Sequence, residues 1–166
     1  MSVVIADTSP VHYLLLIDQI SLLPALFERV FIPATVQCEM LDPKTPASIR
    51  QWMMSPPAWL QVVPDPVPPL TDDLVLTNLD DGERTAIQAA LSMGASLLLM
   101  DDRAGVGAAT HRGLIVTGTL GILKLAAAHG LIDVEAALKR LAATNFRCPP
   151  ALIDRIFEPL RRRELK

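Results

Sequence analysis

Acidic side chains follow two apolar segments of the chain, in positions that suggest one shared pocket. Residues 3–6 form a short apolar run that ends at Asp7, and residues 97–100 form a second run that ends at Asp101 and Asp102. In an open α/β sheet, sites form just beyond the carboxyl ends of the strands. These carboxylates are therefore expected to lie together. The ordinary alternative for the first run is that Asp7 and Ser9 cap the following helix.

Two further acids are expected on helices near the same edge of the sheet. Glu39 falls on a helix predicted over residues 34–41, and Glu83 falls in the first turn of a helix capped by Asp80 or Asp81. Glu39 has an ordinary interpretation as a solvated surface charge. Glu83 has one as a carboxylate stabilised by the positive end of its helix. Because both helices start at the edge where the strands end, both acids are also candidates for the pocket.

Metal binding is the chemistry that such a cluster favours. Carboxylates gathered without basic partners raise one another's pKa, and a hard cation relieves their repulsion. Mg²⁺ takes one or two carboxylates together with waters and substrate phosphates. Two such ions can activate water and stabilise the leaving oxygen in phosphodiester cleavage. The predicted cofactor is Mg²⁺ or Mn²⁺, because no cluster of softer ligands competes: His12, His111, His129, Cys38 and Cys148 are scattered along the chain.

Apolar runs and turn residues predict strands that alternate with helices. This alternation is typical of an α/β fold with a parallel sheet and right-handed crossovers. Prolines 64, 66, 68 and 69 form an extended connection that we expect to be a loop inside one domain. The expected strands are residues 3–6, 30–32, 60–63 (near an edge), 96–100 and 114–117. The expected helices are one or two short ones after Pro10, then residues 34–41, 47–54, 84–93, 104–111, 120–129, 134–143 and 151–165.

Length and composition limit the classes of protein. The 166 residues suffice for one domain with a substantial core, and the 51% hydrophobic content suggests that a partner covers some apolar surface. No apolar run approaches the ~20 residues of a membrane helix, and no signal peptide is evident. A cytoplasmic location with reduced thiols is expected. The net charge of −3 argues against a broad nucleic-acid-binding surface. Local contacts would then depend on Arg103, Arg112, Arg140 and Arg147.

Other α/β families that use acids fit less well. A phosphoaspartate phosphatase needs Asp-x-Asp after the first strand, but Ser9 stands at the second position. A receiver domain needs its acidic pair after the first strand and a lysine after the fifth, where this chain has Thr119. The chain contains neither GxGxxG nor GxxxxGK[ST], so nucleotide binding of those types is not supported.

The order and spacing of these motifs resemble the PIN domain. The resemblance is clearest over residues 3–130, and the segment 118–123 is most similar to the bacterial and archaeal branch related to VapC-type toxins. It implies a three-layer α/β/α fold with a central parallel sheet of about five strands. The residues that carry it are Asp7-Thr8-Ser9-Pro10, Ile32-Pro33 leading to Glu39, Gly82-Glu83 and Leu99-Met100-Asp101-Asp102-Arg103.

The resemblance also implies roles for individual residues. Asp7 and Glu39 match the first two metal-binding acids of the family, Glu83 matches a helix acid, and Asp102 matches the last acid. Asp101 takes the place of an asparagine, and many toxins carry an aspartate at a differently placed helical position instead of Glu83. The predicted catalytic and metal-binding residues are thus Asp7, Glu39, Glu83, Asp101 and Asp102; Ser9 and Thr119 are supporting hydroxyls that hold water or a carboxylate, and Arg103 and Arg112 are RNA-binding.

The activity that the resemblance implies is a metal-dependent endoribonuclease that cleaves single-stranded RNA, as the toxin of a toxin–antitoxin pair. Its expected partners are single-stranded or structured RNA, a small antitoxin protein and a second copy of the chain, with the dimer interface between residues 14 and 54. The alternative is a non-catalytic RNA- or protein-binding module with a PIN fold. The full set of acids favours the enzyme, because an argument from a site is stronger than one from a fold.

The whole chain, residues 1–166, is expected to be a single PIN-like domain with a C-terminal helical extension over residues 131–166. The last helix carries Ile153, Ile156, Phe157 and Leu160 at helical spacing, followed by three arginines. We expect this helix to pack on the core with a solvated basic end. The alternative is that its arginines contact RNA phosphate or an acidic partner.

Overall fold

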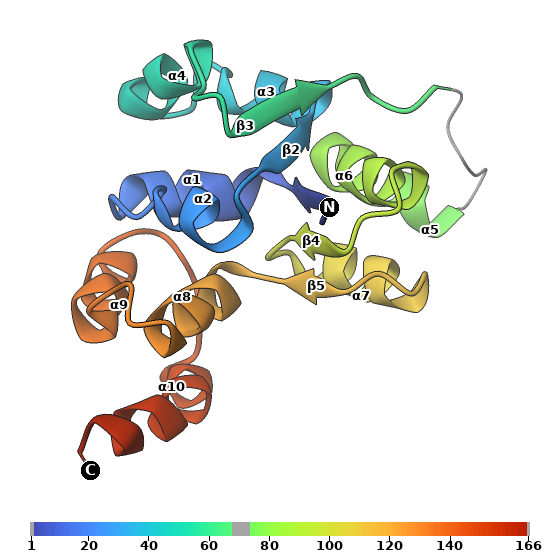
Figure 1. Cartoon of the computed structure of the whole chain (residues 1–166). Coiled ribbons are helices and arrows are strands. Elements are labelled where there is room, and N and C mark those ends of the chain that lie inside the picture. Colours follow the sequence, from blue (N-terminus) through green and yellow to red (C-terminus); the bar gives the residue numbers. More distant parts are fainter. Residues whose placement is uncertain (1, 68–73, 166) are drawn as a thin grey trace.

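The computed structural model describes residues 2–67 and 74–165 of the chain. Within these residues the strands form one parallel sheet in the order β3-β2-β1-β4-β5 (Figure 1). The predicted α/β fold with about five parallel strands is confirmed, and so is the edge position of the third strand. The strands are β1 (Val4–Ala6), β2 (Val30–Pro33), β3 (Leu60–Val63), β4 (Leu97–Leu99) and β5 (Val116–Thr117).

Each face of the sheet has its own apolar core. Successive side chains of a strand point to opposite faces. Val4 and Ala6 therefore lie in one core with Leu99, whereas Ile5 lies in the other with Leu98. A parallel sheet needs apolar cover on both faces, and helices supply it. One face is covered by α6 (Asp81–Ser92) and α7 (Arg103–His111), and the other by α1 (Thr8–Leu16), α2 (Leu22–Phe27) and α8 (Thr119–Ala128) (Figure 1).

The other described helices are α3 (Ala34–Met40), α4 (Ala47–Met54), α5 (Leu74–Thr77), α9 (Val134–Ala142) and α10 (Pro150–Glu164). Several element ends lie one to three residues from their predicted positions, and three further details differ from the sequence prediction. Helix α1 starts at Thr8 rather than after Pro10, because a proline fits in the first turn of a helix. Strand β5 has two residues rather than four, and the short helix α5 was not predicted. Of the proline-rich connection, Pro68 and Pro69 lie outside the described residues.

The two C-terminal helices pack on the same core as α1 and α8. Phe157 of α10 is fully buried there, and α9 contributes Leu138 and Leu141. Beyond Phe157, Arg161 pairs with Glu135 and Asp154, and Arg162 pairs with Glu158. The expected packing of the last helix is therefore present, and part of its basic end is paired within the extension itself. None of the helices in the described part of the chain has the length and apolar character needed to cross a bilayer.

Candidate active site

The carboxyl ends of the two central strands bring the first acids together. Ala6 of β1 pairs with Leu99 of β4, and the Asp7 amide donates a hydrogen bond to the Leu99 carbonyl at 2.8 Å. Asp7 therefore leaves the sheet beside the segment that carries Asp101 and Asp102. Parallel strands end at one edge, so residues 94 positions apart along the chain become neighbours.

Asp7 is the most buried acid of this edge. It stands at the N-cap position of α1, yet its side chain makes no N-capping hydrogen bond. The residue is only 4% exposed. Burial, with smaller contributions from the charges of Asp80, Glu39 and Glu83, raises the pKa of Asp7 to about 7. The alternative that Asp7 simply caps the next helix is therefore wrong, and its carboxyl group belongs to the acidic cluster.

The Glu39 side chain, near the end of α3, is held by residues at the starts of two other helices, α1 and α6. Its carboxylate accepts hydrogen bonds from the Thr8 hydroxyl and from the Gly82 amide, the latter at 2.9 Å. A side chain at position 82 would collide with this carboxylate, so only glycine allows the close approach. Glu39 is half-buried in this arrangement. It is not the freely solvated charge that its helix position alone would allow.

Glu83 and Asp80 form a reciprocal pair at the N-terminus of α6. The Glu83 amide donates to Asp80 Oδ1 at 2.8 Å, and the Asp80 amide donates to Glu83 Oε2 at 3.3 Å, which is a capping box. Glu83 is 8% exposed. Burial raises the pKa of Glu83 to about 7, with further contributions from the charges of Asp80 and Asp102. Sequence reasoning treated Asp80 only as a helix cap, although the structure also places it within the acidic cluster.

Asp101 is clamped by Thr119. The Thr119 amide donates to Asp101 Oδ1 at 2.7 Å, and the fully buried Thr119 hydroxyl donates to Oδ2 at 2.6 Å. Gly118 permits this contact, because a Cβ there would lie 2.5 Å from Asp101 Oδ1. Burial raises the pKa of Asp101, and the two hydrogen bonds from Thr119 lower it. Asp101 thus satisfies the start of α8, and it also lines the cavity described below.

Asp102 occupies the N-cap of α7. Its Oδ1 accepts from the amides of Ala104 and Gly105 at 2.9 and 3.1 Å. The residue is exposed, and its charge acts on Glu83. Both hydrogen bonds go to one oxygen, and no described residue donates to Oδ2. Asp102 therefore combines a structural role with a position at the rim of the cluster.

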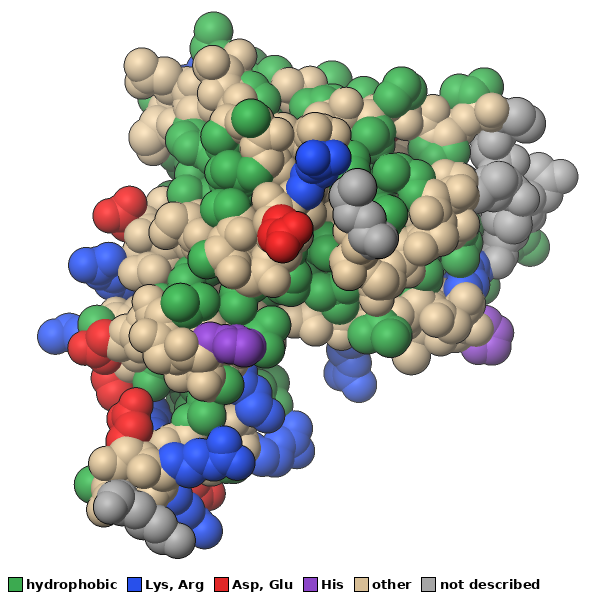
Figure 2. Space-filling view, viewed as in Figure 1, with side chains coloured by type: hydrophobic (Ala, Val, Ile, Leu, Met, Phe, Trp, Pro, Cys, Tyr) green, Lys and Arg blue, Asp and Glu red, His purple; other side chains and the backbone are tan. Residues whose placement is uncertain are grey.

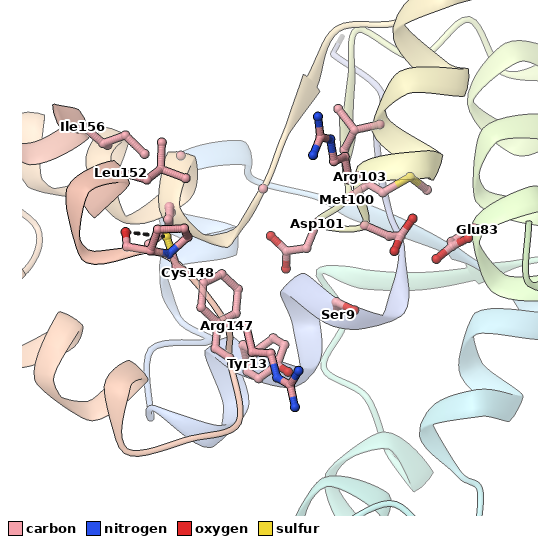
Figure 3. A pocket seen from close by; sticks show the side chains of 17 residues that line it. Ser9, Tyr13, Glu83, Met100, Asp101, Arg103, Arg147, Cys148, Leu152 and Ile156 are labelled. Atoms are coloured by element: carbon pink, nitrogen blue, oxygen red, sulfur yellow. Dashed lines mark hydrogen bonds between the residues drawn. The ribbon is translucent and has the colours of Figure 1, made fainter. Parts of the chain in front are cut away.

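A cavity of about 580 Å³ opens over these acids. Glu83, Asp101 and Asp102 line it, together with Ser9 and Arg103 (Figure 3). Of the predicted site residues, the cavity thus gathers three acids, one hydroxyl residue and one arginine. Asp7 lies nearby as a buried neighbour of Glu83, and Glu39 lines an adjacent cavity.

Arg112 is not part of this arrangement. It follows the last residue of α7, whereas Arg103 is the first residue of that helix. The nine residues of α7 separate the two arginines by roughly 13 Å along the helix axis. The Arg112 side chain donates to the Ala108 carbonyl at 2.7 Å. The structure therefore brings Arg103 to the cavity and leaves Arg112 at the far end of the helix.

The donor set of the cluster fits a hard divalent cation. Its ligating atoms are carboxylate oxygens, and among the described residues no lysine or arginine forms an ion pair with Asp7, Glu39, Glu83 or Asp101. The pKa values of Asp7 and Glu83 are raised to about 7, first by burial and then by neighbouring carboxylates, and both effects disfavour the charged form. As the side chains lie, however, no three or more His, Cys, Asp or Glu residues in the described part of the chain form a ready metal cage.

One comparison with known proteins matches this chain. A family model described as a PIN domain matches residues 3–162. The matched region contains every acid described above and extends into α10. No curated protein and no solved structure matches the chain.

Proposed function

The chain belongs to the PIN-domain family, whose fold is that of a nuclease, and on this premise we propose that it is a metal-dependent endoribonuclease of single-stranded RNA. The observation that supports the proposal is the gathering of buried carboxylates without basic partners at one sheet edge. Asp7 and Glu83 hold their protons up to about pH 7, because burial and like charges oppose ionisation. A divalent cation offsets both effects, so a cluster of this kind is suited to bind one.

The residues proposed to hold one or two Mg²⁺ or Mn²⁺ ions are Asp7, Glu39, Glu83, Asp101 and Asp102. When bound, such ions provide a nucleophilic water at neutral pH and stabilise the leaving oxygen of a phosphodiester. The protein itself contributes positioning. Thr119 fixes both oxygens of Asp101, the Thr8 hydroxyl and the Gly82 amide fix Glu39, and the capping box orients Glu83.

The proposal extends to partners. A toxin role, with a small antitoxin protein and a homodimer, rests on the resemblance to VapC-type toxins and on exposed apolar side chains that a partner can cover. Met54, Ile115 and Leu131 are such side chains, at 75%, 68% and 46% exposure. A cytoplasmic location is part of the same proposal and agrees with the two free thiols of Cys38 and Cys148.

A non-catalytic RNA- or protein-binding role is the second candidate. The structural use of Asp102 as a helix cap and of both Asp101 oxygens by Thr119 favours it. In this case the acids would serve the fold, and neither metal binding nor cleavage would be detected.

The deciding experiment is a cleavage assay on a mixed RNA pool in Mg²⁺, Mn²⁺ or EDTA, together with calorimetric titration of the metal. We expect cleavage that requires metal and that falls by orders of magnitude in Asp7→Asn and Asp102→Asn. Asparagine is as good an N-cap as aspartate, so the Asp102 variant keeps α7 while it loses the charge. Circular dichroism checks that both variants fold.

The results distinguish the metal-dependent nuclease from the non-catalytic binding module. Cleavage that persists in EDTA, or in both variants, contradicts the metal mechanism. If wild-type protein shows neither cleavage nor metal binding, the non-catalytic candidate replaces the enzyme.

A further inference from the structure

The cavity over the acids extends well beyond them. Its opposite wall is made by residues 146–149, which connect α9 to α10, and by Leu152 and Ile156 of α10. Tyr13 of α1 also lines it. In Figure 3, Glu83 lies toward one end of the cavity, Leu152 and Ile156 lie toward the other, and Asp101 lies between them. The C-terminal extension therefore completes a groove that begins at the candidate active site.

An aromatic pair forms part of this groove. The rings of Tyr13 and Phe146 meet edge to face, with centroids 4.9 Å apart and an angle of 84° between their planes. The Tyr13 hydroxyl donates to Asn145 Oδ1 at 3.0 Å, which fixes the ring relative to the connecting segment. Both aromatic residues are half-buried and line the cavity. Fixed aromatic side chains in a groove are the platforms on which bases of single strands stack.

A basic side chain, that of Arg147, lies next to this aromatic pair. Arg147 follows Phe146 in the chain, lines the cavity, is exposed, and forms no ion pair with any described residue. Figure 3 shows Arg147 beside Tyr13. Arg161 and Arg162 of the same extension are instead occupied by acidic partners.

The distribution of charge along the chain points to the same region. Residues 139–166 contain eight of the 15 Lys and Arg residues of the protein and three of its 18 Asp and Glu residues. Figure 2 shows Lys and Arg side chains over the C-terminal helices, with a few acidic side chains among them. A polyanion is repelled by the acidic cluster and attracted by the extension. On the wall formed by the extension, Arg147 is the basic side chain that a strand reaching the acids can contact.

We propose that this groove binds a nucleotide of the single-stranded RNA substrate next to the scissile phosphate, with its base on Tyr13 and Phe146 and its backbone phosphate on Arg147. The proposal rests on the proposed function, because it assumes that the acids cleave the strand. The size of the cavity, about 580 Å³, lies within the range of ordinary ligand sites. The aromatic pair favours a nucleobase over an acidic peptide, which would use the arginine alone.

The test separates stacking from charge. Binding of a labelled adenosine octamer, and of an abasic ribose–phosphate octamer of equal length, is measured by fluorescence anisotropy on the full chain in EDTA. Phe146→Leu keeps the apolar volume but removes the ring. It is therefore expected to weaken binding of the adenosine octamer about fivefold or more. The affinity of this variant for the abasic octamer should stay within about twofold of the wild-type affinity, because an abasic strand has no base to stack.

Arg147→Ala is expected to weaken both octamers and to reduce the dependence of log Kd on log salt by about 0.7, the value for one phosphate contact on a single strand. Arg155→Ala is the matched control. Arg155 is an exposed arginine of α10 that does not line the cavity, so its loss should change binding less than about twofold. In the Mg²⁺ cleavage assay, the two groove variants should raise KM and leave kcat near the wild-type value.

Three outcomes would overturn the proposal. If wild-type protein cleaves RNA but both groove variants bind and cleave like wild type, the groove is not the subsite, and the proposed function stands. If Phe146→Leu weakens both octamers equally, its effect is not stacking. If wild-type protein neither binds the adenosine octamer nor cleaves RNA, the groove proposal and the proposed function fail together.

Discussion

Asp7 is an ionisable residue whose burial has a cost that changes with pH. Its pKa, raised by burial from 3.8 to about 7, means that the folded protein holds this proton more tightly than the unfolded chain. The contribution of the Asp7 proton to stability is complete below pH 3.8, the pKa of Asp7 in the unfolded chain, and it is lost as the pH rises to about 7. A shift of three pKa units corresponds to roughly 4 kcal/mol in the free energy of unfolding.

We therefore expect metal-free protein to unfold at a lower temperature at pH 8 than at pH 5. Asp7→Asn should raise the melting temperature at pH 8, because the amide has no charge to bury, and should change it little at pH 5. Thermal denaturation followed by circular dichroism in EDTA measures both. Asp18→Asn is the control, since Asp18 is exposed and asparagine tolerates its positive φ of 58°. A variant at position 7 with the full pH dependence of wild type would contradict the prediction.

Thr119 is expected to act as a positioning residue. Thr119→Val has nearly the same shape but loses the hydroxyl that donates to Asp101. Without this bond the pKa of Asp101, already raised by burial, rises further. Cleavage should fall about tenfold or more, as with other supports of a metal ligand, and the acidic limb of the pH profile should move to higher pH.

Thr119→Ser restores the hydroxyl and should recover most of the activity and the original profile. Loss of activity in both variants would indicate that packing, rather than the hydrogen bond, is what position 119 provides.

At the scale of elements, the N-terminus of α6 unites three features: the Asp80–Glu83 capping box, the Gly82 amide and the Glu39 carboxylate. Helix propensity alone predicts that Gly82→Ala stabilises α6 by roughly 1 kcal/mol. The structure predicts a different result, because the new methyl group occupies the space of the Glu39 carboxylate. Glu39 ends a flexible side chain, so it should move away while the fold survives.

Gly82→Ala is thus expected to fold with a melting temperature near that of wild type and to lose metal affinity and cleavage. Gly107→Ala in α7 is the matched control, because nothing lies within 4 Å of the added Cβ. That variant should gain stability and keep its activity. Calorimetric metal titration and thermal melts check both, and full metal affinity in Gly82→Ala would exclude Glu39 as a ligand.

On the scale of the whole molecule, the C-terminal helix and the first strand share one core. Phe157 of α10 is 0% exposed within the cluster that also holds Val4. Phe157→Ala should therefore destabilise the entire chain by about 3–5 kcal/mol. If residues 1–166 form a single domain, as we predict, unfolding stays one cooperative transition at a lower temperature.

Leu165→Ala is the control, since Leu165 is 89% exposed. Truncation after Pro159 keeps Phe157 and should cost far less stability than the Phe157 variant. Two separate transitions in Phe157→Ala, with only one of them shifted, would show that the extension folds independently of the sheet.

Local patterns in the sequence determined much of this fold. Apolar runs placed the strands, and helix α4 and strand β3 agree with their predicted bounds to the residue. Such features depend on neighbours within a few positions, as do the helix ends at Asp42-Pro43 and before Gly94. Strand β5 was predicted too long by two residues at its start, where Ile115 is exposed although its carbonyl still accepts a hydrogen bond from the Leu98 amide.

The sequence also determined which acidic residues follow the strands. The tertiary structure decided which of them are buried and which groups they contact. The partner that clamps Asp101 lies 18 residues away, and Thr35 and Asp65 form a similar clamp across 30 residues. No local pattern distinguishes such a clamp from an unpaired carboxylate. The same holds for the aromatic pair of Tyr13 and Phe146, which only packing brings together. Hydrogen bonds, burial and pKa depend on long-range neighbours, and folding alone decides which neighbours those are.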